Sequence, residues 1–134
     1  MSEQNSAARI LVIDRIDYYD LPIRFFSSDE TRDKIRLLIK SLVKDYEPDV
    51  IFCPGIKETM QDRQATTEEI TRITRSKASI FGYETSKHNR FFNPTMFINV
   101  SEEDIDSKIK SVNAFQEFTN RYYFNADAIR SLSV

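Results

Sequence analysis

Short, wholly apolar runs alternate in this chain with segments whose apolar residues recur at helical spacing. The clearest run, Val50-Ile51-Phe52-Cys53, lies between Pro48 and Pro54-Gly55. A run that is apolar at every position indicates a strand covered on both faces, because successive side chains of a strand point to opposite faces. Similar runs predict further strands at 10–13, 79–83 and 96–100, and a short extended piece at 23–26.

Helical periodicity accounts for much of the remaining chain. Residues 29–46 predict the longest helix, which Pro48 ends. Ser27 and Glu30 have the spacing of a capping box at its start. A second helix is expected at 62–75 and a short one at 125–132. Ser101 is expected to cap another long helix with Asp104, and its buried stripe comprises Ile105, Ile109, Val112, Phe115 and Phe118.

The order of these elements predicts the fold class. Strands that alternate with helices favour a mainly parallel sheet with helices packed on it. We therefore expect an α/β fold, a three-layer Rossmann-like sheet flanked by helices. The chain has 134 residues, which fits a single domain over 1–134.

Composition excludes several classes of function. The 19 Lys and Arg residues nearly balance the 21 Asp and Glu residues, and no block of like charge stands out. A nucleic-acid partner is therefore not expected. Only two glycines occur, so neither a P-loop nor a dinucleotide-binding fingerprint can be built.

The expected location is the cytoplasm. No apolar segment approaches the roughly 20 residues of a membrane-spanning helix, and residues 1–8 lack the apolar core of a secretory signal. Cys53 is the single cysteine, so no disulfide can form within the chain. Its apolar surroundings favour a buried free thiol over a reactive one.

Several stretches, in order, resemble the PIG-L/LmbE family of zinc-dependent N-acetyl-sugar deacetylases. The resemblance covers about residues 20–132 and is consistent with a partial domain of that family. The matching stretches are DLPIR at 20–24, PDVIF at 48–52, ETMQDR at 58–63, IFGYE at 80–84, FNPTMF at 92–97, KI at 108–109 and RYYFN at 121–125.

This resemblance implies a specific zinc chemistry. In such enzymes the first strand ends in a His-Pro-Asp-Asp motif, whose His and second Asp bind zinc and whose first Asp is the general base. A later loop of the form Asp-x-His-x-Asp-His supplies the third ligand from its last His, and its earlier His assists the charged intermediate. Zinc lowers the pKa of its bound water and polarises the amide carbonyl.

The corresponding loop of this chain departs from that pattern. Glu58 stands at the position of the first loop Asp, Met60 at that of the assisting His, and Asp62 at that of the internal Asp. Arg63 stands at the position of the metal-binding His. A guanidinium is always charged and has no lone pair to donate, so it cannot bind zinc. No zinc or other cofactor is therefore expected.

Other parts of the motif set are absent. The chain contains no His-Pro-Asp-Asp, and Glu117-Phe118 replace a Ser-Gln pair of the family. His88 is the only histidine, and one histidine cannot make a typical zinc site, so we expect it to have no metal role. Asp14, Asp17 and Asp20 are close in sequence, but a solvated loop is the simpler interpretation than a cation site.

Three functional hypotheses remain open. The chain is an inactive member of the deacetylase family, a non-enzymatic module that binds a sugar or a partner, or a hydrolase whose missing ligands come from another chain. Arg24 would lie on the substrate side and contact an N-acetyl sugar or its conjugate. Arg121 and the aromatic residues 122–124 could stack on a sugar, although core packing is commoner. An exposed sheet edge also predicts self-association.

Overall fold

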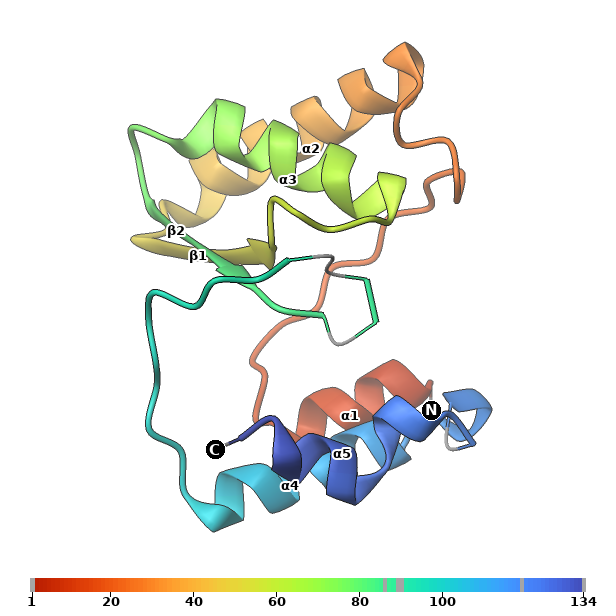
Figure 1. Cartoon of the computed structure of the whole chain (residues 1–134). Coiled ribbons are helices and arrows are strands. Elements are labelled where there is room, and N and C mark those ends of the chain that lie inside the picture. The colour runs from red at the N-terminus through yellow and green to blue at the C-terminus, as the bar shows by residue number, and fades with distance from the viewer. Residues whose placement is uncertain (1, 86, 89–90, 119, 134) are drawn as a thin grey trace. The chain divides into compact units, whose positions relative to one another are not determined.

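The computed structural model describes residues 2–85, 87–88, 91–118 and 120–133 (Figure 1). The chain forms two compact units. We call residues 20–94 the sheet unit, and residues 1–19 together with 95–134 the helical unit. The expectation that 1–134 folds as one domain stays a prediction.

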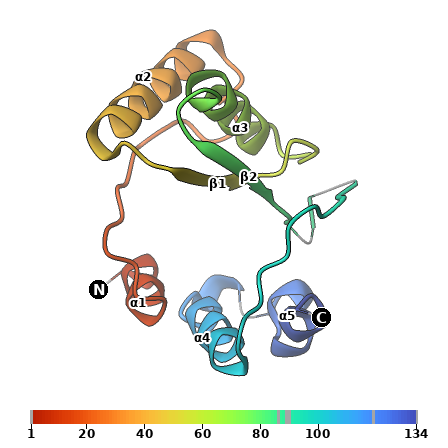
Figure 2. The ribbon, with the colours of Figure 1, turned by 90° about the vertical axis from the view of Figure 1, so that its left-hand side faces the viewer.

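The sheet unit contains two helices and a two-stranded parallel sheet. Its elements are α2 (Asp29–Tyr46), β1 (Val50–Pro54), α3 (Gln61–Thr74) and β2 (Ser79–Tyr83). The strands pair from Val50 with Ser79 through Pro54 with Tyr83. Both helices lie over the same face of the sheet, with α3 forming the crossover between the strands (Figure 2). The α/β class predicted from the sequence is confirmed.

Helix α2 has the predicted bounds but a different N-cap. The Ser28 hydroxyl accepts from the Thr31 N–H at 3.3 Å, so the capping box assigned to Ser27 and Glu30 is wrong. Ser28 takes this role because its backbone is extended there, as an N-cap requires. At the other end Glu47 adopts a left-handed conformation, donates its N–H to the Val43 carbonyl, and is followed by Pro48.

Strand β1 is buried on one face only, contrary to the sequence prediction. Val50 and Phe52 are 46% and 57% exposed, whereas Cys53 is 2% exposed. The physical reason is that α2 and α3 cover one face, so that alternate side chains of β1 point away from them (Figure 2). Phe52 instead stacks on Phe81 at a ring-centroid distance of 5.7 Å. Cys53 is a buried free thiol, as predicted, and burial raises its pKa.

The helical unit contains α1 (Glu3–Ile10), α4 (Glu102–Asn113) and α5 (Ala126–Ser131), with short 3₁₀ turns at Gln116–Phe118 and Tyr122–Phe124. Helix α4 packs against both other helices. Ser101 and Asp104 form the predicted capping box, and Asn125 caps the predicted short helix. Of the predicted stripe, Ile105 is buried, and Ile109 and Val112 are half-buried on α4. Phe115 and Phe118 lie beyond the end of this helix, so that part of the prediction is wrong. The buried apolar residues described in this unit are two alanines and two isoleucines: Ala7, Ala8, Ile105 and Ile129.

Two predicted strands and the short extended piece are wrong. Residues 10–13 end helix α1 instead: the Ile13 N–H bonds back to the Ala8 carbonyl, and Val12 has a φ of 55°. Residues 96–100 form no regular structure, and Met96, Phe97, Ile98 and Val100 are exposed. Residues 23–26 form turns. An apolar run becomes a strand only where a neighbouring strand satisfies its backbone, and these segments have none among the described residues.

Candidate functional site

The loop between β1 and α3 leaves the carboxyl end of the sheet and is closed by backbone contacts. The Gly55 N–H donates to the Tyr83 carbonyl at 3.0 Å, and the Glu58 N–H donates to the Gly55 carbonyl at 3.0 Å. A Cβ on Gly82 would lie 3.2 Å from the Gly55 Cα. The two glycines of the chain therefore meet where the strands end, and a side chain on Gly82 would push them apart.

Glu58 is the centre of this loop. Its side chain is fully buried, and both carboxylate oxygens accept hydrogen bonds. Oε1 accepts from the backbone N–H groups of Thr59 at 2.9 Å and Met60 at 3.2 Å. Oε2 accepts from the Thr85 hydroxyl at 2.5 Å and from Arg63 Nη1 at 3.2 Å. The carboxylate thus holds the loop, the start of α3 and the end of β2 together.

The charge of Glu58 is favoured despite its burial. Loss of hydration by itself would raise the pKa of this carboxyl. The hydrogen bonds from Thr85, Met60 and Arg63, with the positive charge of Arg63, outweigh that effect and hold the pKa below its ordinary value. At neutral pH the site is therefore an internal ion pair between Glu58 and Arg63.

Asp62 is engaged with a different segment. Its carboxylate accepts from the backbone N–H groups of Arg24 at 2.6 Å and Phe26 at 3.2 Å. The Gln61 side chain donates to the Arg24 carbonyl. Arg24 has a φ of 71°, a left-handed conformation uncommon for a residue with a side chain. The start of α3 therefore fixes the backbone of residues 24–26, and it is the backbone of Arg24 that meets the loop.

The residues singled out in the sequence have different roles here. Glu58 and Arg63 contact each other, whereas Asp62 accepts from the backbone of residues 24 and 26. Met60 is an exposed N-cap whose side chain makes no capping hydrogen bond. His88 contributes its backbone: its carbonyl accepts from both the N–H and the hydroxyl of Thr59. Thr85 was missed, because nothing local in the sequence marks a hydroxyl as the partner of a glutamate 27 residues away.

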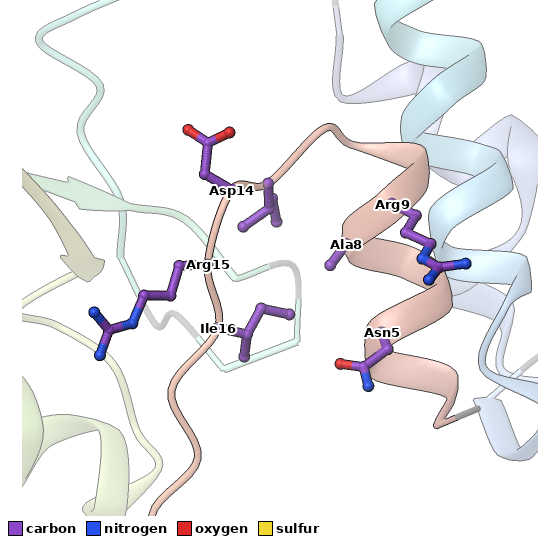
Figure 3. A pocket seen from close by; sticks show the side chains of 7 residues that line it. Asn5, Ala8, Arg9, Asp14, Arg15 and Ile16 are labelled. Carbon is purple, nitrogen blue, oxygen red and sulfur yellow. The ribbon is translucent and has the colours of Figure 1, made fainter.

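The geometry offers little to a metal ion. Among the described residues, no three His, Cys, Asp or Glu side chains gather closely enough to hold one. Asp14, Asp17 and Asp20 form no such group either. Asp17 instead pairs with Arg15 at 2.9 Å. Figure 3 shows the hollow of about 410 Å³ beside α1, where Asp14 and Arg15 point away from the helix and Ile16 points toward it. Its mixed lining indicates no particular ligand.

The aromatic segment near the C-terminus packs only in part. Arg121 donates to the Tyr123 hydroxyl at 2.9 Å, and the Tyr123 ring contacts Tyr122 and Phe124 at centroid distances of 5.1 and 4.8 Å. Tyr123 and Phe124 are half-buried, whereas Tyr122 is exposed. Core packing therefore explains two of the three rings.

Comparisons with known proteins do not assign a family. No protein-family model, no curated protein and no solved structure matches this chain. In the part of the chain that the structure describes, no helix has the length and apolarity needed to cross a lipid bilayer.

Proposed function

We propose that this chain is a relative of the PIG-L/LmbE deacetylases in which the metal-binding loop has become a structural element and no hydrolysis takes place. The proposal includes the family's three-layer, mainly parallel Rossmann-like sheet and a cytoplasmic location. The parallel pairing of β1 and β2 through a crossover helix supports the parallel arrangement of such a sheet. The buried free thiol of Cys53 is compatible with a cytoplasmic location.

One observation carries the proposal. At the two loop positions where the resemblance would place a carboxylate and a metal-binding histidine, Glu58 and Arg63 form an ion pair at 3.2 Å. A cation there repels a divalent metal, and the oxygens of Glu58 already accept from Thr59, Met60 and Thr85. The same ion pair and hydrogen bonds that hold the loop together therefore occupy the groups that could bind zinc.

The test is a hydrolysis assay on N-acetylglucosamine conjugates with added zinc. We expect no deacetylation by the wild-type chain or by the Met60→His, Arg63→His double variant, because the first-strand ligands of the family are absent from the sequence. Zinc-dependent turnover by the wild-type chain would contradict the proposal. It would favour instead a hydrolase completed by a second copy or another chain.

A second candidate, a sugar-binding module, rests on the hollow beside the same loop. This hollow of about 370 Å³ is lined by Ile56, Lys57, Glu58, Thr59, Gln64 and Phe91. Phe91 and Ile56 are exposed, and an exposed ring beside polar groups suits the apolar face and hydroxyls of a sugar. An N-acetyl sugar should then raise the melting temperature of the wild type but not of Phe91→Ala. An equal shift in both proteins would exclude this hollow.

Self-association is the remaining part of the proposal. The sheet has two strands among the described residues, so each strand has an outer edge, and the exposed Val50 and Phe52 lie on its uncovered face. Such surfaces favour pairing between chains. Light scattering should show a mass that rises with concentration, and Phe52→Ser should weaken this rise. A monomer at every concentration would contradict the prediction.

A further inference from the structure

A groove in the sheet unit concentrates positive charge. It has a volume of about 540 Å³ and lies between α2 and the end of α3. Five cationic side chains line it: Arg36, Lys40, Lys44, Arg72 and Lys77. Val43 and Ile73 complete the lining, and no carboxylate is part of it. We call these residues the basic groove.

The helical repeat explains how the groove arises in a chain whose net charge is -2. Arg36, Lys40 and Lys44 are spaced four residues apart, so they lie in one row along α2. Arg72 lies in the last turn of α3 and Lys77 follows that helix. Cations from α2 and from the end of α3, which are separate in sequence, thus line the same groove.

The arginines of the groove are held by carboxylates behind it. Glu69 is fully buried and accepts from Arg36 Nε at 3.0 Å and from Arg72 Nη1 at 3.3 Å. Arg36 also pairs with Asp33 at 2.7 Å. These pairs fix the two guanidinium groups and offset much of their charge.

The lysines, in contrast, have no such partner. Lys40, Lys44 and Lys77 are exposed, and none forms an ion pair with a carboxylate in the part of the chain that the structure describes. Glu47 and Asp49 lie in the neighbouring hollow, which shares Lys44 and Lys77 with the groove, but neither reaches an ion-pair distance to them. Among the described residues, the groove therefore has three lysine side chains that form no ion pair with a carboxylate.

Stabilisation of helix ends explains only part of this arrangement. A helix C-terminus carries about half a negative charge and attracts cations in its last turn. That accounts for Lys44 and Arg72, which lie in the last turns of α2 and α3. Arg36 and Lys40 lie earlier in α2, and Lys77 lies beyond α3. Two helix ends together supply about one negative charge, against three lysines without a carboxylate partner.

We propose that the basic groove binds a compact molecule with several phosphate groups, either a soluble phosphate ester or the phosphorylated headgroup of a lipid. The volume lies within the usual range of small-molecule sites. Lysine is a common point-charge ligand of phosphate, and the fixed arginines add directional donors. Val43 and Ile73 provide an apolar floor for the carbon skeleton of such a ligand.

This site is independent of the loop described above. The Glu58 loop follows the carboxyl end of β1, whereas the groove lies where α2 ends before β1 and where α3 ends before β2. The groove is thus at the opposite end of the strands. The proposal does not depend on whether the chain descends from a deacetylase.

The test uses tripolyphosphate as the soluble probe and phosphoinositide-containing phosphatidylcholine vesicles as the membrane probe. We expect one tripolyphosphate per chain by calorimetric titration, with an affinity that falls as salt is raised. Binding to tripolyphosphate assigns a soluble ligand, and binding to the vesicles alone assigns a lipid headgroup. Binding to neither probe would overturn the proposal.

Matched lysine variants locate the binding. Lys40→Ala and Lys77→Ala should each weaken binding by roughly fivefold, the effect of one charge near a phosphate in water. The control is Lys34→Ala, which removes an exposed lysine from the same helix outside the groove. All three side chains are exposed, so the variants should fold, as circular dichroism can verify. Equal weakening by Lys34→Ala would show that the attraction is not specific to the groove and would overturn the proposal.

Discussion

Two fully buried glutamates anchor different regions of the sheet unit, and their surroundings differ. Glu58, in the loop after β1, accepts from one arginine, two backbone N–H groups and a threonine hydroxyl. Glu69, in the α2–α3 interface, faces Arg32, Arg36 and Arg72. One buried carboxylate is therefore satisfied mainly by neutral dipoles and the other by charges.

Each region depends on its carboxylate in a different way. Two of the donors around Glu58, the N–H groups of Thr59 and Met60, are fixed by the backbone and would be left without this acceptor if the carboxylate were lost. The arginines around Glu69 are held near one another by the negative charge between them and would repel without it. Removal of Glu69 should therefore disturb the packing of two helices, whereas removal of Glu58 should disturb one loop.

The largest expected effect is that of Glu69→Ala. We expect the free energy of unfolding to fall by about 3 kcal/mol, because the change removes the buried carboxylate shared by three arginines. Among the described residues, Arg72 would then have no ion-pair partner. Urea denaturation measures this directly. The control is Glu68→Ala, which removes the adjacent, exposed carboxylate that pairs with Arg32, and should cost less than about 1 kcal/mol. Equal losses for the two variants would contradict the assignment of Glu69 as the anchor.

Glu58→Gln should have the next largest effect, a loss of about 2 kcal/mol. An amide keeps the shape of the side chain but weakens the bonds from Arg63 and from the backbone. The exposed Glu84→Gln serves as the control and should leave stability unchanged. Coupling between Glu58→Gln and Arg63→Met in a double-mutant cycle should be about 1 kcal/mol, since Arg63 is partly exposed. Strict additivity would show that the pair contributes nothing.

Acid should act on both glutamates in the same direction. Their pKa values are lowered from the ordinary 4.5, because hydrogen bonds and arginine charges outweigh burial. A carboxyl group whose pKa is lower in the folded state adds stability above 4.5 and loses it as pH falls through the folded value. The unfolding free energy should therefore drop below about pH 4.5, and less so in Glu69→Ala. An equal drop in wild type and variant would contradict this origin.

Local signals predicted much of the sheet unit. Residues 29–46 and 79–83 were correct because helical period, a proline stop and a compact apolar run act over short distances. Residues 10–13 and 96–100 carry an equally apolar pattern, but a strand also needs a neighbour, and sequence alone does not supply one. The burial of β1 was overestimated for a related reason. Apolar side chains on both faces of a strand show that either face could be buried, but not whether helices pack on both of them.

The candidate site was predictable in composition but not in bonding. The side chains of the loop, Met60 and Arg63 among them, can be read from the sequence. The partners of Glu58 and Asp62, in contrast, come from Thr85 and from the backbone of Arg24. These contacts depend on how distant segments meet. Part of the basic groove, in contrast, can be predicted from the sequence. Arg36, Lys40 and Lys44 are spaced four residues apart, which places them in one row on a helix although they are not contiguous.

Zinc stoichiometry tests the central claim most directly, since that claim is that Glu58 and Arg63 close the loop to a metal ion. The full chain, without an affinity tag, would be equilibrated with zinc and then separated from excess metal. Its zinc content would be measured by inductively coupled plasma mass spectrometry. We predict far less than one zinc per chain, and no change in the melting temperature. One firmly retained zinc per chain, lost on Glu58→Gln, would contradict the account.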